Sequence, residues 1–179
     1  MRAVFLDRDG TVTVGIPTYE RVDSIDKVEL LPGVLEALTL LAGLDYGVFF
    51  VTNQAGIAEG LLTKARFNTI NAFAIGLLAP SGIRILKTYC CPHGEHANCT
   101  CRKPKPRMLL QAAEEYAIDL KQSYMIGDRI SDVMTGINAG SKTILVQTGT
   151  VKETSDIATY SAPTLLAAIQ YVAAHTRQA

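Results

Sequence analysis

Four segments of the chain place acidic, hydroxyl, amide or basic side chains at the ends of apolar runs. These side chains are Asp7 and Asp9, Thr52 and Asn53, Arg102 and Lys103, and Asp128. Carboxylate oxygens are preferred ligands of Mg²⁺, and hydroxyl, amide and ammonium groups suit the oxygens of a phosphate. The combination of residue types predicts the transfer of a phosphoryl group at a magnesium site.

Each of these segments also has an ordinary structural interpretation. An Asp-x-Asp-Gly segment is typical of a solvated turn, and Thr52 followed by Asn53 is typical of a turn that caps a helix. Lys103 by itself is typical of a solvated surface. Because this interpretation requires four coincidences at four strand ends, we favour a single site, in which Asp7 and Asp128 bind one Mg²⁺ between them.

The remaining polar groups complete that site. The backbone carbonyl of Asp9 is expected as a further magnesium ligand. Thr52 and Asn53 are expected to bind phosphate oxygens, and Lys103 to offset the negative charge of the carboxylates and the phosphate.

The elements that must position these residues alternate along the chain. Buried strands are expected at 3–6, 47–51, 85–90, 124–126 and 143–146, and helices at 30–44, 63–78, 105–116, 130–139 and 165–174. Such alternation predicts an α/β fold, a Rossmann-like parallel sheet with helices on both faces. In these sheets ligands bind beyond the carboxyl ends of the strands. The polar residues are therefore expected to converge on one edge of the sheet.

A second group of residues has the spacing of a metal site. Cys91 and His93 are followed, after five residues, by Cys99 and Cys101. Four such ligands suit a closed tetrahedral Zn²⁺ site, in which no coordination position remains for catalysis. Two further residues, Cys90 and His96, leave the ligand set open. We prefer Cys91 and His93 because their spacing mirrors that of Cys99 and Cys101.

The alternative for the loop 91–101 is a set of reduced cysteines without metal. The loop contains Pro, Gly, His and Asn and has little apolar mass to bury free thiols. We therefore expect zinc to supply folding energy here. The ion would also fix the position of Arg102 and Lys103, which follow its last ligand directly.

The length and composition of the chain indicate which class of protein it belongs to. The 179 residues contain no repeat or linker and are expected to form one domain, 1–179. A hydrophobic content of 48% and a charged content of 19% are typical of a soluble globular protein. Lys plus Arg and Asp plus Glu number 17 each, so no broad field attracts nucleic acid or a membrane.

The location of the protein is inferred from what the chain does not contain. It has neither a recognisable signal peptide nor a run of about 20 apolar residues that would span a bilayer. The expected location is the cytoplasm, and the expected form is a monomer. In a reducing compartment, four cysteines between Cys90 and Cys101 are expected to bind metal, not to form disulfides.

The motifs together resemble those of the haloacid dehalogenase superfamily of phosphatases. The matching segments are DRDGT at 7–11, TNQ at 52–54, RKP at 102–104 and GDRISD at 127–132. The resemblance implies that Asp7 attacks phosphorus to form an aspartyl-phosphate, and that Asp9 acts as general acid and then general base. It also implies that Thr52 and Lys103 bind the phosphoryl group, while Asp128 completes the magnesium shell. Asp132 is either a partner of these groups or only an acid in the first turn of its helix.

The Cys/His loop is similar to that of one branch of this superfamily. The branch holds D-glycero-D-manno-heptose-1,7-bisphosphate phosphatases and histidinol-phosphate phosphatases, which have no large cap domain. The segments TNQAGIAEGLLT and CRKPKPRMLL more closely resemble the heptose enzymes. Glu59, Arg107 and the divergent segment 14–26 depart from that pattern.

Substrate and alternatives follow from this resemblance. The expected substrate is a small sugar phosphate, and the expected reaction removes the 7-phosphate of the heptose bisphosphate. Arg102 and Arg129 either bind the second phosphate or the hydroxyl groups of this substrate, or are solvated beside the site. The alternatives are a histidinol-phosphate phosphatase, a nucleic-acid 3′-phosphatase and a non-catalytic zinc module that binds a partner. The balanced charge disfavours a nucleic-acid groove. The pair of aspartates in the first motif disfavours a module that only binds.

Overall fold

The computed structural model of the protein describes residues 1–15 and 25–176. Its centre is a six-stranded sheet with the strand order β3-β2-β1-β4-β5-β6, and every neighbouring pair is parallel. The strands are β1 (Ala3–Leu6), β2 (Gly47–Asn53), β3 (Ile85–Cys91), β4 (Tyr124–Gly127), β5 (Lys142–Val146) and β6 (Tyr160–Ala162). This is the expected Rossmann-like α/β architecture.

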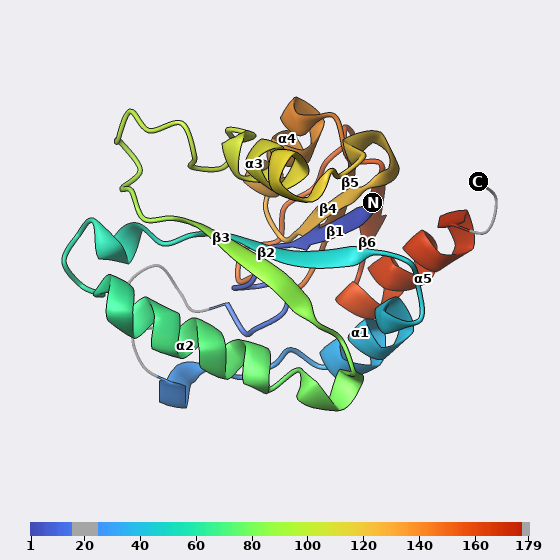
Figure 1. The fold of residues 1–179 in the computed structure, drawn as a ribbon, viewed down its shortest axis with the longest axis horizontal. Helices are drawn as coiled ribbons and strands as arrows, with labels where there is room; N and C mark the ends of the chain where they lie inside the picture. The colour runs from blue at the N-terminus through green and yellow to red at the C-terminus, as the bar shows by residue number, and fades with distance from the viewer. Residues whose placement is uncertain (16–24, 177–179) are drawn as a thin grey trace.

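Helices cover both faces of the sheet, as Figure 1 shows. They are α1 (Val34–Ala42), α2 (Lys64–Gly76), α3 (Arg107–Tyr116), α4 (Ile130–Ala139) and α5 (Leu165–Thr176). Helices α1 and α5 pack together on one face, and α3 and α4 lie on the other. Among the described residues there is no separate domain that caps the sheet.

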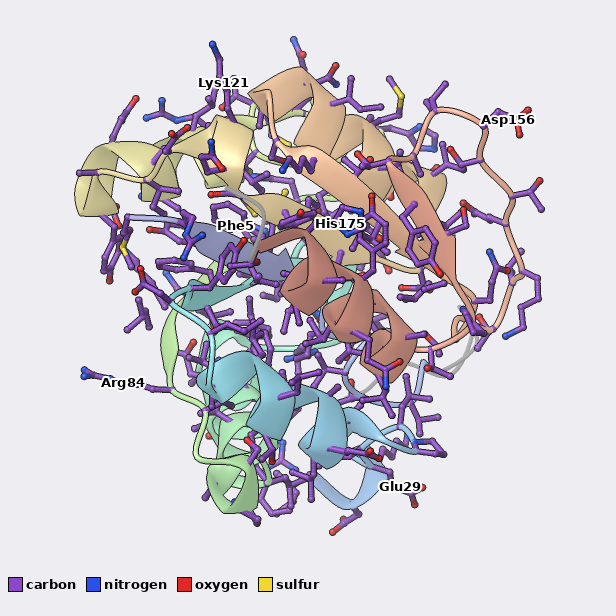
Figure 2. All side chains as sticks on the ribbon, turned by 90° about the vertical axis from the view of Figure 1, so that its right-hand side faces the viewer. Phe5, Glu29, Arg84, Lys121, Asp156 and His175 are labelled. Atoms are coloured by element: carbon purple, nitrogen blue, oxygen red, sulfur yellow. The ribbon has the colours of Figure 1, made fainter. Side chains whose placement is uncertain are left out.

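The short strand β1 illustrates how the core forms. Val4 and Leu6 face the cluster that includes α1 and α5, whereas Ala3 and Phe5 face the cluster that includes α3. Each of these four side chains is fully buried. A parallel strand buried on both faces is apolar at every position, which is why the sequence reads as a continuous apolar run. Figure 2 shows the labelled Phe5 within the sheet layer, while Arg84 and Lys121 extend from the surface.

Helix α2 packs beside the sheet over a smaller cluster. Phe67, Ile70 and Ala74 on this helix contact Val28 and Leu62. Thr63 is the N-cap of this helix, because its hydroxyl accepts a hydrogen bond from the backbone N–H three residues later. Gly140 ends α4 and adopts a left-handed conformation with φ of 82°, which glycine favours.

Most elements differ from the sequence-based bounds by only one or two residues, and three differences change the local packing. Strand β6 was not expected. Helix α1 begins at Val34 and not at Leu30, because Leu30 and Leu31 pair with the segment after β1. Strand β3 extends one residue further than expected, to Cys91, whose side chain is buried in the core. Cys90 is only half-buried and packs against the α2 cluster.

The carboxyl ends of β1, β2 and β4 meet at one edge of the sheet, where the loops with the candidate site residues begin. Most of the divergent segment 14–26 lies outside the described residues. Within the described part of the chain, no helix combines the length and the apolar character needed to cross a membrane.

Candidate active site

Asp7 lies directly after β1 and forms an ion pair with Lys103. The Asp7 Oδ1 atom accepts a hydrogen bond from the backbone N–H of Arg8 at 2.8 Å, and lies 2.8 Å from the Lys103 ammonium nitrogen. The other oxygen, Oδ2, accepts no hydrogen bond from the described part of the chain. One oxygen of Asp7 is therefore fixed, and the other remains available for chemistry.

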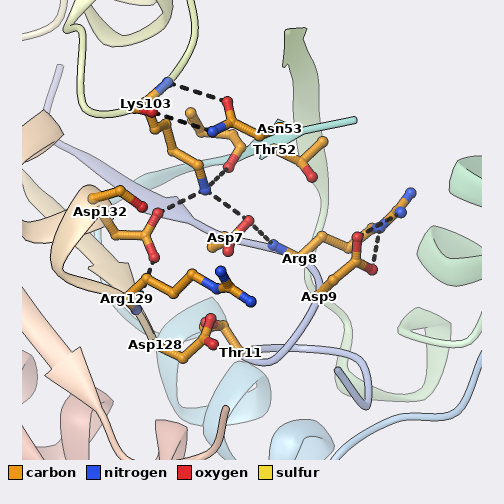
Figure 3. A network of polar contacts seen from close by, with 12 residues as sticks. Asp7, Arg8, Asp9, Thr11, Thr52, Asn53, Lys103, Asp128, Arg129 and Asp132 are labelled. Atoms are coloured by element: carbon orange, nitrogen blue, oxygen red, sulfur yellow. Dashed lines mark hydrogen bonds and ion pairs between the residues drawn. The ribbon is translucent and has the colours of Figure 1, made fainter. Parts of the chain in front are cut away.

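Lys103 is almost fully buried, and its ammonium group contacts three oxygens (Figure 3). Besides Asp7, these belong to Asp132 at 2.6 Å and to the backbone carbonyl of Val51 at 3.0 Å. Burial acts to lower the pKa of Lys103, but the charges of Asp132 and Asp7 raise it above its usual value. The ammonium group therefore remains charged and joins the loop after β3 to the ends of β1 and β2.

Three buried carboxylates form a cluster around this ammonium group. Asp7, Asp128 and Asp132 each offer an oxygen, and these oxygens all lie within 4.8 Å of one another. Asp128 accepts a hydrogen bond from the Thr11 hydroxyl at 3.1 Å. Gly149 packs so closely that a Cβ atom there would lie 2.2 Å from Asp128 Oδ2. The carboxylate of Asp128 is thus confined at the edge of the sheet.

The electrostatics of this cluster show an excess of negative charge. Burial raises the pKa of Asp7 to about 8, and the charges of Asp132 and Asp128 add to this effect while Lys103 opposes it. Burial and the charge of Asp132 also raise the pKa of Asp128, to about 6. A divalent cation would relieve both effects, and carboxylate oxygens are the donors that Mg²⁺ prefers. The residues present therefore fit a magnesium ion.

Asp132 contacts both Lys103 and the start of α4. One of its oxygens pairs with the ammonium group, and the other accepts a hydrogen bond from the backbone N–H of Arg129 at 3.1 Å. The sequence left two alternatives for Asp132, a partner of the site or an acid in the first helical turn. In the structure it is both.

Asp9 is held by four hydrogen bonds on a different side of Asp7 (Figure 3). Its carboxylate accepts two from the Arg8 guanidinium, at 2.9 and 2.8 Å, one from the Thr13 hydroxyl at 3.0 Å and one from the Gln54 amide at 2.8 Å. Burial acts to raise the pKa of Asp9, but the charge of Arg8 and these hydrogen bonds lower it below its usual value. The position of this carboxylate is therefore set by its neighbours.

Arg8 is itself one of the most buried side chains, with 1% exposure. Its guanidinium carbon lies 5.3 Å from the centre of the Phe67 ring, and its Nη1 atom has no hydrogen-bond partner among the described residues. The sequence analysis did not select Arg8 or Gln54, although both lie inside the motif segments. A basic residue between two motif aspartates is the signal that could have identified Arg8.

Thr52 and Asn53 are the last two residues of β2 but have different contacts. Thr52 is buried, and its hydroxyl accepts a hydrogen bond from Gln54 at 2.9 Å. The Asn53 side chain contacts the backbone of Lys103 twice: it accepts from the N–H at 3.1 Å and donates to the carbonyl at 3.3 Å. In this structure, then, Asn53 fixes the loop that contains Lys103.

Two arginines were expected to bind the distal part of a substrate. The Arg102 guanidinium donates to the backbone carbonyl of His93 at 3.3 Å. The exposed Arg129 side chain extends in the direction of Asp7 in Figure 3. Of the two residues that depart from the heptose pattern, Glu59 is exposed, and Arg107 is exposed and lies 3.8 Å from Glu114.

The four expected zinc ligands lie together in the loop after β3. Cys91 Sγ is 3.8 Å from Cys99 Sγ, 3.1 Å from Cys101 Sγ and 3.5 Å from His93 Nδ1. In a tetrahedral zinc site, with Zn–S of about 2.3 Å and Zn–N of about 2.0 Å, neighbouring ligand atoms lie roughly 3.5–3.8 Å apart. The distances from Cys91 to Cys99 and to His93 match these values, and the distance to Cys101 is shorter; the four ligand types and their proximity fit Zn²⁺. Cys90 is not part of this cluster.

The Cys/His loop is joined to the rest of the site by backbone contacts. The N–H groups of Gln54 and Ala58 donate to the carbonyls of Cys91 and Pro92, at 2.8 and 3.1 Å. The Lys105 ammonium group donates to the carbonyl of Cys99. The loop is therefore connected both to the segment after β2 and to the segment that contains Lys103.

Comparison with known proteins identifies the class. A HAD-hydrolase-like family model matches residues 100–173. The crystal structure of D,D-heptose 1,7-bisphosphate phosphatase from B. bronchiseptica, complexed with magnesium and phosphate, superimposes with a TM-score of 0.89. It is 32% identical and the match covers 98% of this chain and 99% of that one. The fold, the motifs and these similarities define a phosphatase of the haloacid dehalogenase superfamily.

Curated relatives identify the family within that class. The D-glycero-β-D-manno-heptose-1,7-bisphosphate 7-phosphatase of Pasteurella multocida is 41% identical over 155 residues, which cover 83% of each chain. The protein of that name from Escherichia coli (strain K12) is 38% identical over 156 residues, with 82% and 80% covered. The chain belongs to the family of D-glycero-β-D-manno-heptose-1,7-bisphosphate 7-phosphatases.

Proposed function

We propose that this phosphatase removes the 7-phosphate of D-glycero-β-D-manno-heptose 1,7-bisphosphate through a covalent phosphate on Asp7. The observation that carries the chemistry is the buried contact of Asp7 with Lys103, beside Asp128 at the end of the sheet. The names of the relatives support the choice of sugar and of the β anomer.

In the first step Asp7 attacks the phosphorus atom of the 7-phosphate. Its Oδ2 atom forms the new P–O bond, while Oδ1 is held by Lys103 and the N–H of Arg8. The bond between phosphorus and the sugar oxygen breaks, and its electron pair leaves on that oxygen. Because its neighbours lower the pKa of Asp9 in the free protein, Asp9 must take up a proton as the substrate binds; it donates this proton to the alkoxide, so that the sugar leaves as a neutral alcohol.

In the second step water removes the phosphate from Asp7. The Asp9 carboxylate accepts a proton from the water as its oxygen attacks phosphorus. The bond between phosphorus and Asp7 then breaks and returns its electron pair to the carboxylate, which releases inorganic phosphate. Both residues are restored to their starting states.

We propose that Lys103 and Thr52 stabilise the negative charge of the phosphoryl group. Negative charge spreads over the phosphoryl oxygens in the transition state, so donors placed in advance supply much of the rate. Lys103 provides a cation that is already positioned by Asp132 and Val51. Asn53 supports it by fixing its backbone and thus acts on the phosphate indirectly.

Magnesium is proposed to be held by Asp7, Asp128 and the backbone carbonyl of Asp9. When bound, the ion neutralises charge on the phosphoryl group and on the clustered carboxylates. The raised pKa values of Asp7 and Asp128 support this assignment, because burial and the neighbouring aspartates disfavour the charged carboxylates that a cation would stabilise.

Zinc is proposed for the cluster of Cys91, His93, Cys99 and Cys101. It would hold the loop that carries Arg102 and Lys103, which is otherwise supported by few apolar contacts. Arg102 and Arg129 are then available for the second phosphate or the hydroxyl groups of the sugar. The exposure of Glu59 and Arg107 supports the view that these departures do not alter the chemistry.

The test is phosphate release in the presence of Mg²⁺ on a panel of substrates. It contains both anomers of the heptose 1,7-bisphosphate, histidinol phosphate and 4-nitrophenyl phosphate. We expect kcat/KM of about 10⁴ M⁻¹s⁻¹ or more for the β anomer, the ordinary range for a physiological substrate. A higher value for histidinol phosphate would overturn the heptose assignment, and slow cleavage of only the aryl ester would leave just the phosphatase class.

A further inference from the structure

Gln54 lies between two groups of the proposed site. Its side-chain amide nitrogen donates to Asp9 Oδ2 at 2.8 Å and to Thr52 Oγ1 at 2.9 Å. The two N–H bonds of one amide group thus join the carboxylate of the proposed acid to the hydroxyl of the proposed phosphate site. The distance between these two groups is limited by the size of the amide.

The backbone of Gln54 is fixed by the neighbouring strand. Its N–H donates to the Cys91 carbonyl at 2.8 Å, and the N–H of Ala58 donates to the Pro92 carbonyl at 3.1 Å. These contacts continue the pairing of β2 with β3 past Asn53 and Cys91. The amide of Gln54 therefore projects from a backbone that cannot shift without moving the start of the Cys/His loop.

The other partners of Asp9 do not perform the same function. Arg8 and Thr13 donate to the Asp9 carboxylate, but within the described part of the chain neither donates to Thr52. They hold the carboxylate to the loop after β1. Only the contact through Gln54 places it relative to the end of β2, where the phosphate is proposed to bind.

We propose that Gln54 is a positioning residue, which orients the Asp9 carboxylate toward the oxygen that leaves phosphorus. This inference rests on the proposed function, in which Asp9 protonates that oxygen. It adds that the proton transfer depends on a residue outside the catalytic pair, and that this residue is tied to the zinc loop through its backbone.

The proposal predicts a dependence on the leaving group. A sugar alkoxide is a poor leaving group and needs the proton, whereas 4-nitrophenolate leaves phosphorus without one. A variant that misplaces Asp9 should therefore lose activity mainly on alkyl phosphates. A side chain that only stabilised the fold would affect both substrates equally.

The test compares kcat/KM for the heptose bisphosphate and for 4-nitrophenyl phosphate in Gln54→Met. Methionine keeps the length of the side chain and removes both N–H donors. The value of kcat/KM depends only on the steps up to phosphoryl transfer to Asp7. The later role of Asp9 as a base therefore does not affect it. We expect the heptose value to fall about 10-fold to 100-fold and the aryl value by less than about 3-fold.

A rapid-mixing measurement gives a second readout. Because Asp9 also activates water in the second step, Gln54→Met should slow the hydrolysis of the covalent intermediate. With 4-nitrophenyl phosphate, we expect a burst of 4-nitrophenolate that approaches one equivalent per chain. Gln54→Leu, which also removes both donors, is expected to give the same selective loss and replaces Gln54→Met if that variant folds poorly.

The matched control is Gln111→Met on α3. The Gln111 amide donates to Glu115 at 2.8 Å on the helix surface, so the same chemical change is made outside the site. We expect its ratio of the two kcat/KM values to equal that of the wild type. An equal loss on both substrates in Gln54→Met, or no loss, would overturn the proposal. If the wild-type protein does not accept the heptose, the comparison is made with another alkyl phosphate that it hydrolyses, so the two proposals are tested separately.

Discussion

The described part of the chain contains two clusters of residues that could hold a metal ion, and they are built in opposite ways. The carboxylates of Asp7, Asp128 and Asp132 are buried and lie at the ends of strands and the start of a helix. Of the four residues in the Cys/His cluster, only Cys91 is buried, and the other three lie in the loop beyond β3. The first cluster is positioned by the sheet and the second by its own ligands.

The difference shows which part of the protein depends on a metal for its shape. The carboxylate cluster is surrounded by core residues and by Lys103, so its geometry exists before an ion binds. The loop 92–101 has no apolar core of its own, and the expected source of its order is zinc. Removal of magnesium should therefore change the electrostatics of one site, whereas removal of zinc should change the conformation of the other.

The largest expected effect is that of Asp7→Asn on turnover. Loss of the nucleophile should lower kcat by roughly 10⁴-fold or more, while the fold remains intact. Because burial raises the pKa of Asp7 to about 8, the folded protein favours an uncharged group at this position, and asparagine supplies one. Phosphate release and thermal unfolding, measured side by side on metal-free protein, check both parts. Substantial residual activity would show that another residue is the nucleophile.

A second substitution, Lys103→Met, tests whether the carboxylate cluster is held by its ammonium group. It leaves Asp7 and Asp132 buried without their cation. Breaking a buried pair in this way costs about 3–5 kcal/mol, which urea unfolding would detect.

The control for this substitution comes from the other cluster. Lys105→Met removes an exposed contact with the Cys99 carbonyl and should cost less than about 1 kcal/mol. Equal losses in Lys103→Met and Lys105→Met would contradict the contrast between the two clusters.

Zinc removal tests the second cluster directly. Protein purified without added metal should contain about one zinc per chain, and Cys99→Ser should contain less. Loss of the ion should displace Arg102 and Lys103 and lower kcat/KM by up to about 10²-fold, as expected for a shift of about 1 Å. Amide hydrogen exchange should increase in the loop and remain unchanged in β1 and β4. An absence of zinc in the purified wild type would refute the assignment.

The smallest expected effect is a pH dependence of stability in the metal-free protein. The folded pKa of Asp7, about 8, lies above its ordinary value of 3.8, so the native state binds more protons between these pH values. The contribution of Asp7 to stability is present below about pH 4 and is lost as the pH rises toward 8. Urea unfolding from pH 5 to 8 should show this decline.

Two comparisons isolate the contribution of the carboxylate cluster to that decline. Asp7→Asn should reduce the slope, and Mg²⁺ should offset the loss by about 2.7 kcal/mol at 100 times its Kd. A slope that is the same in the wild type and in Asp7→Asn would assign the pH dependence to other groups.

Much of the fold was predictable because its signals are local. Strands β1, β2, β4 and β5 are continuous apolar runs, since a parallel strand is buried on both faces. The cap of α2 at Thr63 and the end of α4 at Gly140 follow from single residues. Strand β6 has no such signal. It is three residues long with one buried side chain, and it exists because it pairs with β5.

The sequence by itself determined which residue types stand at the strand ends, and the rule for parallel sheets predicted that they converge. It also determined the spacing of Cys91, His93, Cys99 and Cys101, because that spacing lies within one loop. Only the tertiary structure decided that Asn53 contacts the backbone of Lys103, that Arg8 and Gln54 hold Asp9, and that Lys103 joins Asp7 to Asp132. These contacts connect residues on different strands and loops. Their geometry depends on the register of the sheet and on side-chain direction, neither of which a linear pattern contains.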